Sequence, residues 1–87
     1  MNDRKMAEYL DYVVRLVGRE NRPVKEARTL LLIRAEELKI PLAADSIWIR
    51  GEGQALRISI SYERDIQIPG LRSTVYRKQF EHAAAYH

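Results

Sequence analysis

Residues 55–70 have the sequence ALRISISYERDIQIPG, and the alternation within this stretch decides the fold. A period of two along the chain predicts a β-strand with one apolar face and one polar face. We expect this strand to cover residues 55–68, with a bend or bulge near residues 63–65, where three charges interrupt the pattern. Pro69-Gly70 then predicts a turn. The apolar positions are Leu56, Ile58, Ile60, Tyr62, Ile66 and Ile68, and the positions between them are Arg57, Ser59, Ser61, Glu63, Asp65 and Gln67.

Two shorter stretches flank this strand and are predicted to pair with it. Residues 47–50, IWIR, alternate in the same way, and the following Gly51-Glu52-Gly53-Gln54 has two glycines that suit a hairpin turn. Residues 72–82 form the third predicted strand, with Thr74, Tyr76, Phe80 and His82 on one side. The result is a three-stranded antiparallel meander with residues 55–68 at its centre. The last residues, AAAYH, show no pattern that predicts a structure.

The first half of the chain has the periodicity of two helices. Residues 3–17 repeat apolar side chains at helical spacing, with Asn2 or Asp3 as candidate caps and Gly18 as the expected stop. Residues 23–39 form the second predicted helix, with Pro23 at its first position and Pro41 beyond its end.

These elements predict a single α+β domain over residues 1–87, with two N-terminal helices packed on one face of the three-stranded antiparallel sheet. We expect the polar face of the sheet to meet water or a partner. The expected core comprises Val13, Val17, Leu31, Ala35, Leu38, Ile58, Ile60, Tyr62 and Phe80.

The composition is that of an ordinary globular domain and excludes several classes. Of the 87 residues 46% are hydrophobic and 31% are charged, and there is no cysteine, so disulfides and thiolate metal sites are ruled out. No segment approaches the roughly 20 apolar residues that cross a bilayer, and the charged start MNDRKMAEYL is no signal peptide. The net charge of +3 is a mild basic excess.

No catalytic, metal-binding or cofactor-binding pattern is present. The two histidines, His82 and His87, lack partners at ligand spacing. The serines of the central strand are its outward phase, and the glycines at 51 and 53 belong to a hairpin, not to a phosphate-binding turn before a helix. We therefore expect a protein without enzymatic activity, cofactor or small-molecule substrate.

The candidate interface residues lie in the strand-rich half. Trp48 has three open interpretations: a core or self-interface residue, a contact with a partner protein, or a stacking group for nucleic acid. In the nucleic-acid alternative, Arg72 and Lys78 would join the basic candidates. The candidate set is Trp48, Arg50, Arg57, Arg64, Tyr76 and Arg77.

Several short stretches also carry a resemblance. They are the connector from Leu38 to Ile49, the aromatic Tyr62 that closes the strand, the sequence IQIPG at residues 66–70 and the FEH ending at residues 80–82. Over residues 8–82 the chain resembles the soluble, extracytoplasmic domain of small bacterial single-pass membrane proteins that have a pilin-like N-terminal anchor and no assigned activity.

The resemblance implies a function and a location. It implies a membrane anchor ahead of Met1, a position on the periplasmic side of the cytoplasmic membrane and a role in assembly or scaffolding. Together with the absence of catalytic patterns, it favours a non-enzymatic domain that binds a protein partner or associates with itself. A small basic nucleic-acid-binding module is the alternative.

Overall fold

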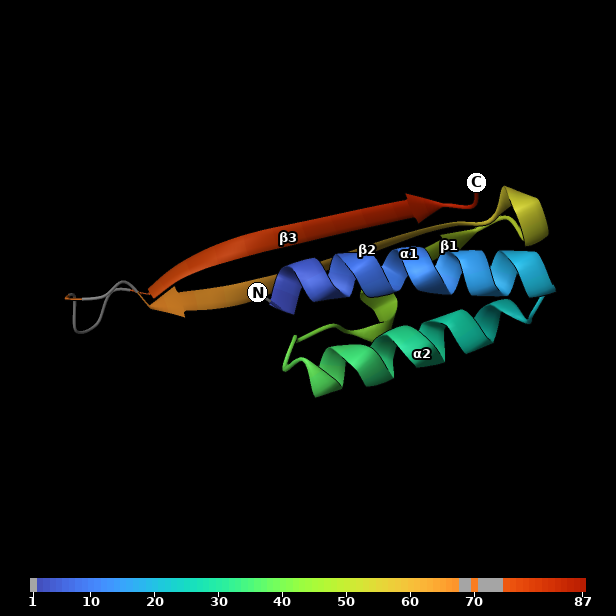
Figure 1. Cartoon of the computed structure of the whole chain (residues 1–87). Helices are drawn as coiled ribbons and strands as arrows, with labels where there is room; N and C mark the ends of the chain where they lie inside the picture. The colour runs from blue at the N-terminus through green and yellow to red at the C-terminus, as the bar shows by residue number, and fades with distance from the viewer. Residues whose placement is uncertain (1, 68–69, 71–74) are drawn as a thin grey trace.

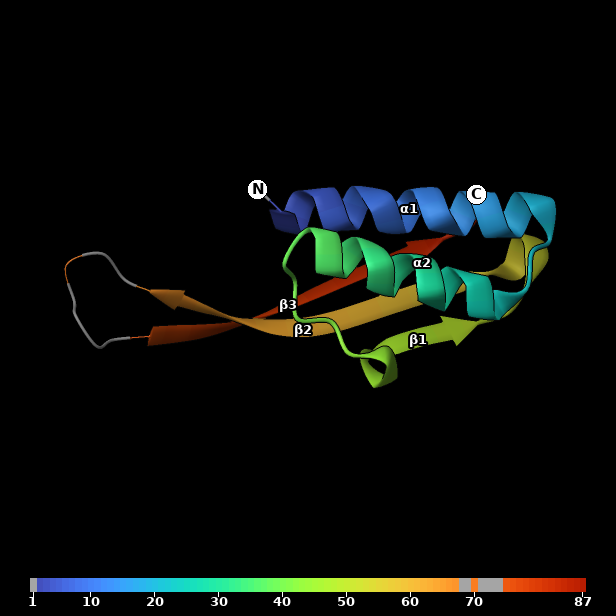
Figure 2. The ribbon, with the colours of Figure 1, turned by 90° about the horizontal axis from the view of Figure 1, so that it is seen from below.

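A computed structural model describes residues 2–67, 70 and 75–87. Two helices, α1 (Asn2–Glu20) and α2 (Val24–Glu37), precede the strands β1 (Ile47–Arg50), β2 (Arg57–Gln67) and β3 (Val75–Ala85). The helices lie side by side on one face of the sheet, as Figures 1 and 2 show from two directions. The predicted α+β fold, with two helices on one face of a three-stranded antiparallel sheet, is confirmed.

The sheet has the order β1-β2-β3, with antiparallel pairing throughout. The register of β2 and β3 runs without a slip from the pair Arg57–Ala85 to the pair Gln67–Val75. The bulge predicted near residues 63–65 is therefore wrong. The three charged residues keep their one-to-one pairing because their side chains find partners: Asp65 binds Arg77, and Arg64 binds Asp3 in α1.

Two strand limits differ from the predicted ones, and two others cannot be compared. β2 begins at Arg57 rather than at residue 55, because a short 3-10 turn occupies Gly53–Ala55. The predicted ends at residues 68 and 72, with Pro69 and Thr74, fall outside the described residues. β3 extends to Ala85, three residues past the predicted end at residue 82.

The C-terminal tail, for which the sequence predicts no structure, belongs to the fold. Ala83, Ala84 and Ala85 pair with residues 57–59 of β2. The backbone N–H of Tyr86 then donates to the carbonyl oxygen of Leu56 at 3.0 Å. Alanines have no alternation of polarity to reveal a strand, so the pairing with β2, not a local pattern, determines their structure.

The prediction that Gly18 ends the first helix is also wrong. α1 continues to Glu20, and Asn21 then adopts the left-handed conformation that ends it, with φ of 50°. Gly18 is buried instead: a methyl group there would lie 2.6 Å from the ring of Tyr86 and 2.8 Å from the carbonyl oxygen of Gly53. The glycine serves close packing of α1 against the tail.

The second helix is shorter than the predicted range of residues 23–39. Pro23 precedes the first helical turn with an extended ψ of 137°, and Lys39 is left-handed with φ of 58°. The N–H of Ile40 donates to the carbonyl oxygen of Ala35 at 2.8 Å, and the N–H of Lys39 to that of Glu36 at 3.1 Å. These bonds satisfy the last carbonyls of α2 before Pro41 is reached.

The core lies between the helices and the helix-facing side of the sheet. Of the nine predicted core residues, eight are buried, and Phe80 is half-buried and stacks on Tyr62 with ring centroids 5.5 Å apart. Burial of each large aliphatic side chain contributes about 1.5–3 kcal/mol. The largest fully buried side chains are Met6, Leu10, Leu31, Leu56, Ile58, Ile60, Val13, Val14 and Val17.

The sheet is longer than the helical layer. β2 and β3 project past the N-terminus of α1 (Figures 1 and 2), and the molecule measures 49 × 20 × 19 Å. We call residues 63–67 of β2 and 75–79 of β3 the arm. The molecule therefore has a covered body and an uncovered arm built on the same two strands.

Candidate functional site

The face of the sheet opposite the helices is uncovered (Figure 1). We call it the open face. At the β1 end Trp48 lies opposite Ser59, and Ser59 lies opposite Ala83 on the next strand. Trp48 is 51% exposed, so the interpretation of this residue as part of the core is wrong. The large indole stands beside small side chains, which leaves its ring accessible across the sheet.

The small side chains produce shallow hollows around Trp48. One hollow has a volume of 460 Å³ and is bounded by Trp48, Arg50, Arg57 and Ser59. A second, of 410 Å³, lies on the other side of the indole and is lined by Trp48, Ser59, Ile60, Ser61, Glu81, His82 and Ala83. Such hollows suit a planar group or a flat chain segment laid against the indole.

Two arginines give this end of the open face a positive charge. Arg50 and Arg57 are direct cross-strand partners. Like charges placed directly opposite each other destabilise a sheet. Within the described ranges, neither side chain forms an ion pair. An anionic group bound between them would remove the repulsion.

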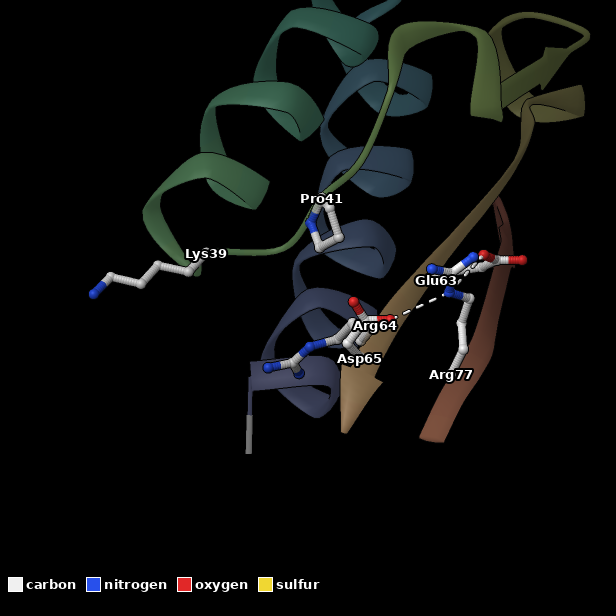
Figure 3. Close-up of a pocket in the computed structure, with 6 residues that line it drawn as sticks. All are labelled: Lys39, Pro41, Glu63, Arg64, Asp65 and Arg77. Atoms are coloured by element: carbon white, nitrogen blue, oxygen red, sulfur yellow. Dashed lines mark hydrogen bonds and ion pairs between the residues drawn. The ribbon is translucent and has the colours of Figure 1, made fainter. Parts of the chain in front are cut away.

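At the other end of the open face, on the arm, one guanidinium pairs with two carboxylates. The Nε of Arg77 lies 3.2 Å from a carboxylate oxygen of Asp65 and 3.9 Å from one of Glu63. Figure 3 shows the hollow of 450 Å³ at this point, with the Lys39 side chain extending away from the other residues. Because Arg77 already pairs with Glu63 and Asp65, and Arg64 with Asp3, this hollow offers an anionic ligand less attraction than the arginine pair does. Its lining is Lys39, Pro41, Glu63, Arg64, Asp65 and Arg77.

A hydrogen-bonded cluster on the helix-facing side joins α1 to the sheet. The Tyr62 hydroxyl donates to Oδ1 of Asp3 at 2.7 Å and lies 3.0 Å from Nε2 of His82. The guanidinium of Arg64 donates to Oδ2 of Asp3 at 2.8 Å. With the carboxylate accepting from Tyr62, the hydroxyl oxygen accepts from a protonated Nε2 of His82.

Burial decides the protonation of this cluster. Desolvation, reinforced by the hydrogen bond to Asp3 and its charge, raises the pKa of Tyr62 above its ordinary value. Desolvation also lowers the pKa of His82, an effect that the negative charge of Asp3 partly opposes. Both groups are therefore neutral near pH 7. The cluster fixes the first turn of α1 over the sheet, and we assign it a structural role.

The structure brings together only part of the predicted interface. Trp48, Arg50 and Arg57 gather at one end of the open face, and Arg77 lies on the same face at the other end. Arg64 and Tyr76 are on the helix-facing side, where Arg64 binds Asp3 and Tyr76 is 56% exposed. Arg72 lies outside the described residues.

The sequence analysis missed the small residues that shape the site. The sequence analysis interprets Ser59 only as part of the outward face of a strand, and it assigns no structure to Ala83 and Ala85. Their role follows from register, which places Ala83 beside Ser59 and Ala85 beside Arg57. The alternation within β2 marked the face of Ser59 and Arg57, but no local signal marked the alanines.

The described part of the chain contains neither a metal-binding cluster nor a helix that could span a membrane. Among these residues, no group of three or more His, Cys, Asp or Glu side chains gathers that would hold a metal ion. Neither described helix is long and apolar enough to cross a membrane.

Comparisons with known protein families, with curated proteins and with solved structures found no match. The resemblance to pilin-like membrane proteins therefore stays a prediction.

Proposed function

We propose that this protein is a non-enzymatic interaction domain that holds a protein partner against the β1 end of its open face. The observation that carries the proposal is the half-exposed Trp48 next to the directly opposed pair Arg50 and Arg57. Tryptophan and arginine are the residue types most enriched among those that dominate binding energy at interfaces. The hollows on either side of the indole supply room for a chain segment.

The charge of the site indicates the chemistry of the partner. A segment that carries Asp or Glu would place a carboxylate between the two guanidiniums, and its neighbouring side chains would cover the indole. Arginine suits this task because its planar fork binds a carboxylate with two hydrogen bonds. The partner segment that fits best is thus acidic and includes an apolar or aromatic residue.

Trp48 is the single tryptophan of the chain, so its fluorescence reports directly on this site. We would titrate the protein with an acidic peptide that contains a phenylalanine, at low salt, and follow the emission of Trp48. Binding is expected to shift the emission to shorter wavelength because the indole leaves water. Arg57→Ala should weaken binding, whereas Arg15→Ala, an equal loss of charge on α1, should not.

Unchanged emission with the peptide, or equal weakening by Arg57→Ala and Arg15→Ala, would contradict the proposal. The second result would show attraction by net charge alone, with no site. Trp48→Phe serves as the spectroscopic blank and should retain most of the binding, measured by calorimetry, because a ring still covers the hollow.

A second candidate is the binding of single-stranded nucleic acid, and the same arginine pair favours it. A base would stack on Trp48 while phosphates meet Arg50 and Arg57. Two phosphate contacts predict that log K falls with log salt at a slope of about −1.4. Titration with a single-stranded oligonucleotide tests this candidate, and binding of the oligonucleotide in preference to the peptide would replace the first proposal.

The resemblance adds a proposed location. We propose that the domain works outside the cytoplasmic membrane as the soluble part of an anchored envelope protein. The features from Leu38 to Ile49 and from Ile66 to Gly70 support this assignment. Fractionation of cells with an antibody against the domain tests it, and recovery in the cytosolic fraction would refute it.

A further inference from the structure

We propose that two copies of this chain pair through their β3 edges, antiparallel and related by a two-fold axis at Gln79, into one continuous six-stranded sheet. This interface runs along the free edge of β3 and does not depend on the proposed binding site at Trp48, Arg50 and Arg57. β3 is the last strand of the order β1-β2-β3, and its outer edge runs over eleven residues, Val75–Ala85. It contains no proline and no bulge, the common devices that keep edge strands from pairing.

The hydrogen bonds of the tail show which backbone groups of β3 point outward. The N–H of Tyr86 donates to the carbonyl oxygen of Leu56, so the backbone of this even-numbered residue faces β2. In an antiparallel ladder, residues whose backbone groups face the paired strand alternate with residues whose groups face away from it. The register then directs the even residues of β3 to β2 and leaves the backbone groups of Arg77, Gln79 and Glu81 at the free edge.

Charge selects the register of the second copy. With the two-fold axis at Gln79, Arg77 of each copy lies opposite Glu81 of the other, giving two favourable cross-strand pairs. An axis at Arg77 would oppose arginine to arginine, and an axis at Glu81 would oppose glutamate to glutamate. Arg77 is well placed for the contact because its side chain is 70% exposed despite its bond to Asp65.

The same arrangement covers the arm. Ile66 and Tyr76 are cross-strand partners on the helix-facing side of the arm, and they are 40% and 56% exposed. They lie beyond the start of the helical layer: Asp3 in the first turn of α1 contacts Tyr62, and β2 and β3 continue past the N-terminus of α1 (Figure 2). In the paired sheet, His82 of the second copy lies opposite Tyr76.

The first turn of the second copy's α1 therefore starts beside Tyr76. From there this helix runs toward the end of the arm, because α1 follows β3 from His82 to Tyr86. The two helical layers do not overlap, since the two α1 helices begin on either side of the two-fold axis and run away from each other. Pairing thus places the first turn of a second α1 next to the exposed Tyr76 and leaves the two arms inside the dimer.

Light scattering after gel filtration tests the proposal. The wild-type chain should have twice its 10.2 kDa mass at high concentration and dissociate on dilution. Gln79→Pro removes an N–H at the free edge without removing a bond to β2, so it should give a folded monomer. Gln79→Ala keeps that N–H and should stay dimeric. A dimeric Gln79→Pro variant, or a wild-type chain that is monomeric at every concentration, would overturn the proposal.

Charge reversal provides a test that does not depend on how the proline is tolerated. Arg77→Glu and Glu81→Arg should each raise the dimer dissociation constant by about tenfold or more, because each opposes like charges at two places. An equimolar mixture of the two variants restores an arginine–glutamate pair at both places and should form a heterodimer. A mixture that stays monomeric would refute the β3 interface. Loss of the dimer in Trp48→Ser, with dimers retained in Arg77→Glu and Glu81→Arg, would refute it as well.

Discussion

Ile60 and Ile66 occupy equivalent positions in β2, one in the body and one in the arm, yet their side chains differ in exposure. Both are on the helix-facing side of the strand, an even number of residues apart. Ile60 is 1% exposed and Ile66 is 40% exposed. The difference arises because α1 begins over Tyr62, between the two isoleucines. Alternation thus determines the face on which a side chain lies, and the length of the helical layer determines whether that face is covered.

The largest effect that separates the two regions should come from placing a carboxylate at each isoleucine. Ile60→Asp buries an unpaired charge in the core and should cost more than about 4 kcal/mol, enough to unfold the domain. Ile66→Asp should cost about 1 kcal/mol or less, because water reaches the arm. Thermal melts by circular dichroism at low protein concentration measure both. Similar losses from the two variants would show that the arm is as covered as the body.

The boundary between body and arm depends on the cluster around Tyr62. Tyr62→Phe removes the donor to Asp3 and the acceptor near His82, and should cost about 1.5–3 kcal/mol because the lost bond is to a charged group. Tyr76→Phe, the matched change on the arm, should have no measurable effect. Urea denaturation provides the comparison. Equal stability of the two variants would remove the structural role assigned to the cluster.

At the far end of the body, packing is too close for one added methyl group. Gly18→Ala should destabilise the domain by about 1–3 kcal/mol, since the new Cβ would meet the backbone of Gly53 and the ring of Tyr86. Lys5→Ala at an exposed position of the same helix should be close to neutral. If Gly18→Ala is neutral or stabilising in the same melts, the tail does not pack as closely as described.

The smallest expected effect is a dependence of stability on pH through His82. Its pKa is lowered by desolvation in the folded state from the ordinary value of 6.5. Above this pH, His82 is neutral in both the folded and the unfolded chain, and the free energy of unfolding is highest. As pH falls below it, the unfolded chain takes up the proton first, so stability declines until the folded pKa is passed.

Urea denaturation at about pH 7.5 and about pH 5.5 measures this decline. His82→Gln should reduce the difference between the two values, because the variant has no imidazole to protonate. A wild-type domain that gains stability over this range as the solution is acidified would reverse the assigned direction of the pKa change.

The sequence predicted the layers of this fold better than the residues at which its helices and strands end. Apolar side chains repeat every second residue in a strand and at three- or four-residue spacing in a helix, and this pattern reflects local structure. It therefore predicted both helices, the three strands and eight of the nine core residues correctly. The bulge, the helix stop at Gly18 and the end of β3 were predicted wrongly. Each depends on a partner distant in the chain: Asp3 for Arg64, Tyr86 for Gly18 and residues 57–59 for the alanines.

The candidate site was predictable only in part for the same reason. Trp48, Arg50 and Arg57 were chosen from strand phase and residue type, and the direct opposition of the two arginines required the register of β1 on β2. Whether the indole faced the helices or water depended on which face the helices cover. That choice is made by tertiary packing, which the alternation of β1 alone does not contain.

The first helix contacts residues of β2 and of the C-terminal tail that are distant in the chain, and this has a consequence for folding during synthesis. Asp3 reaches Tyr62 and Arg64 over separations of 59 and 61 residues, and Gly18 packs against Tyr86. Because α1 precedes β2 and β3 in the chain, the part of its apolar stripe that packs on the sheet is covered only after both strands have been synthesised. Such long-range closure slows folding and lengthens the time for which that stripe is open to chaperones.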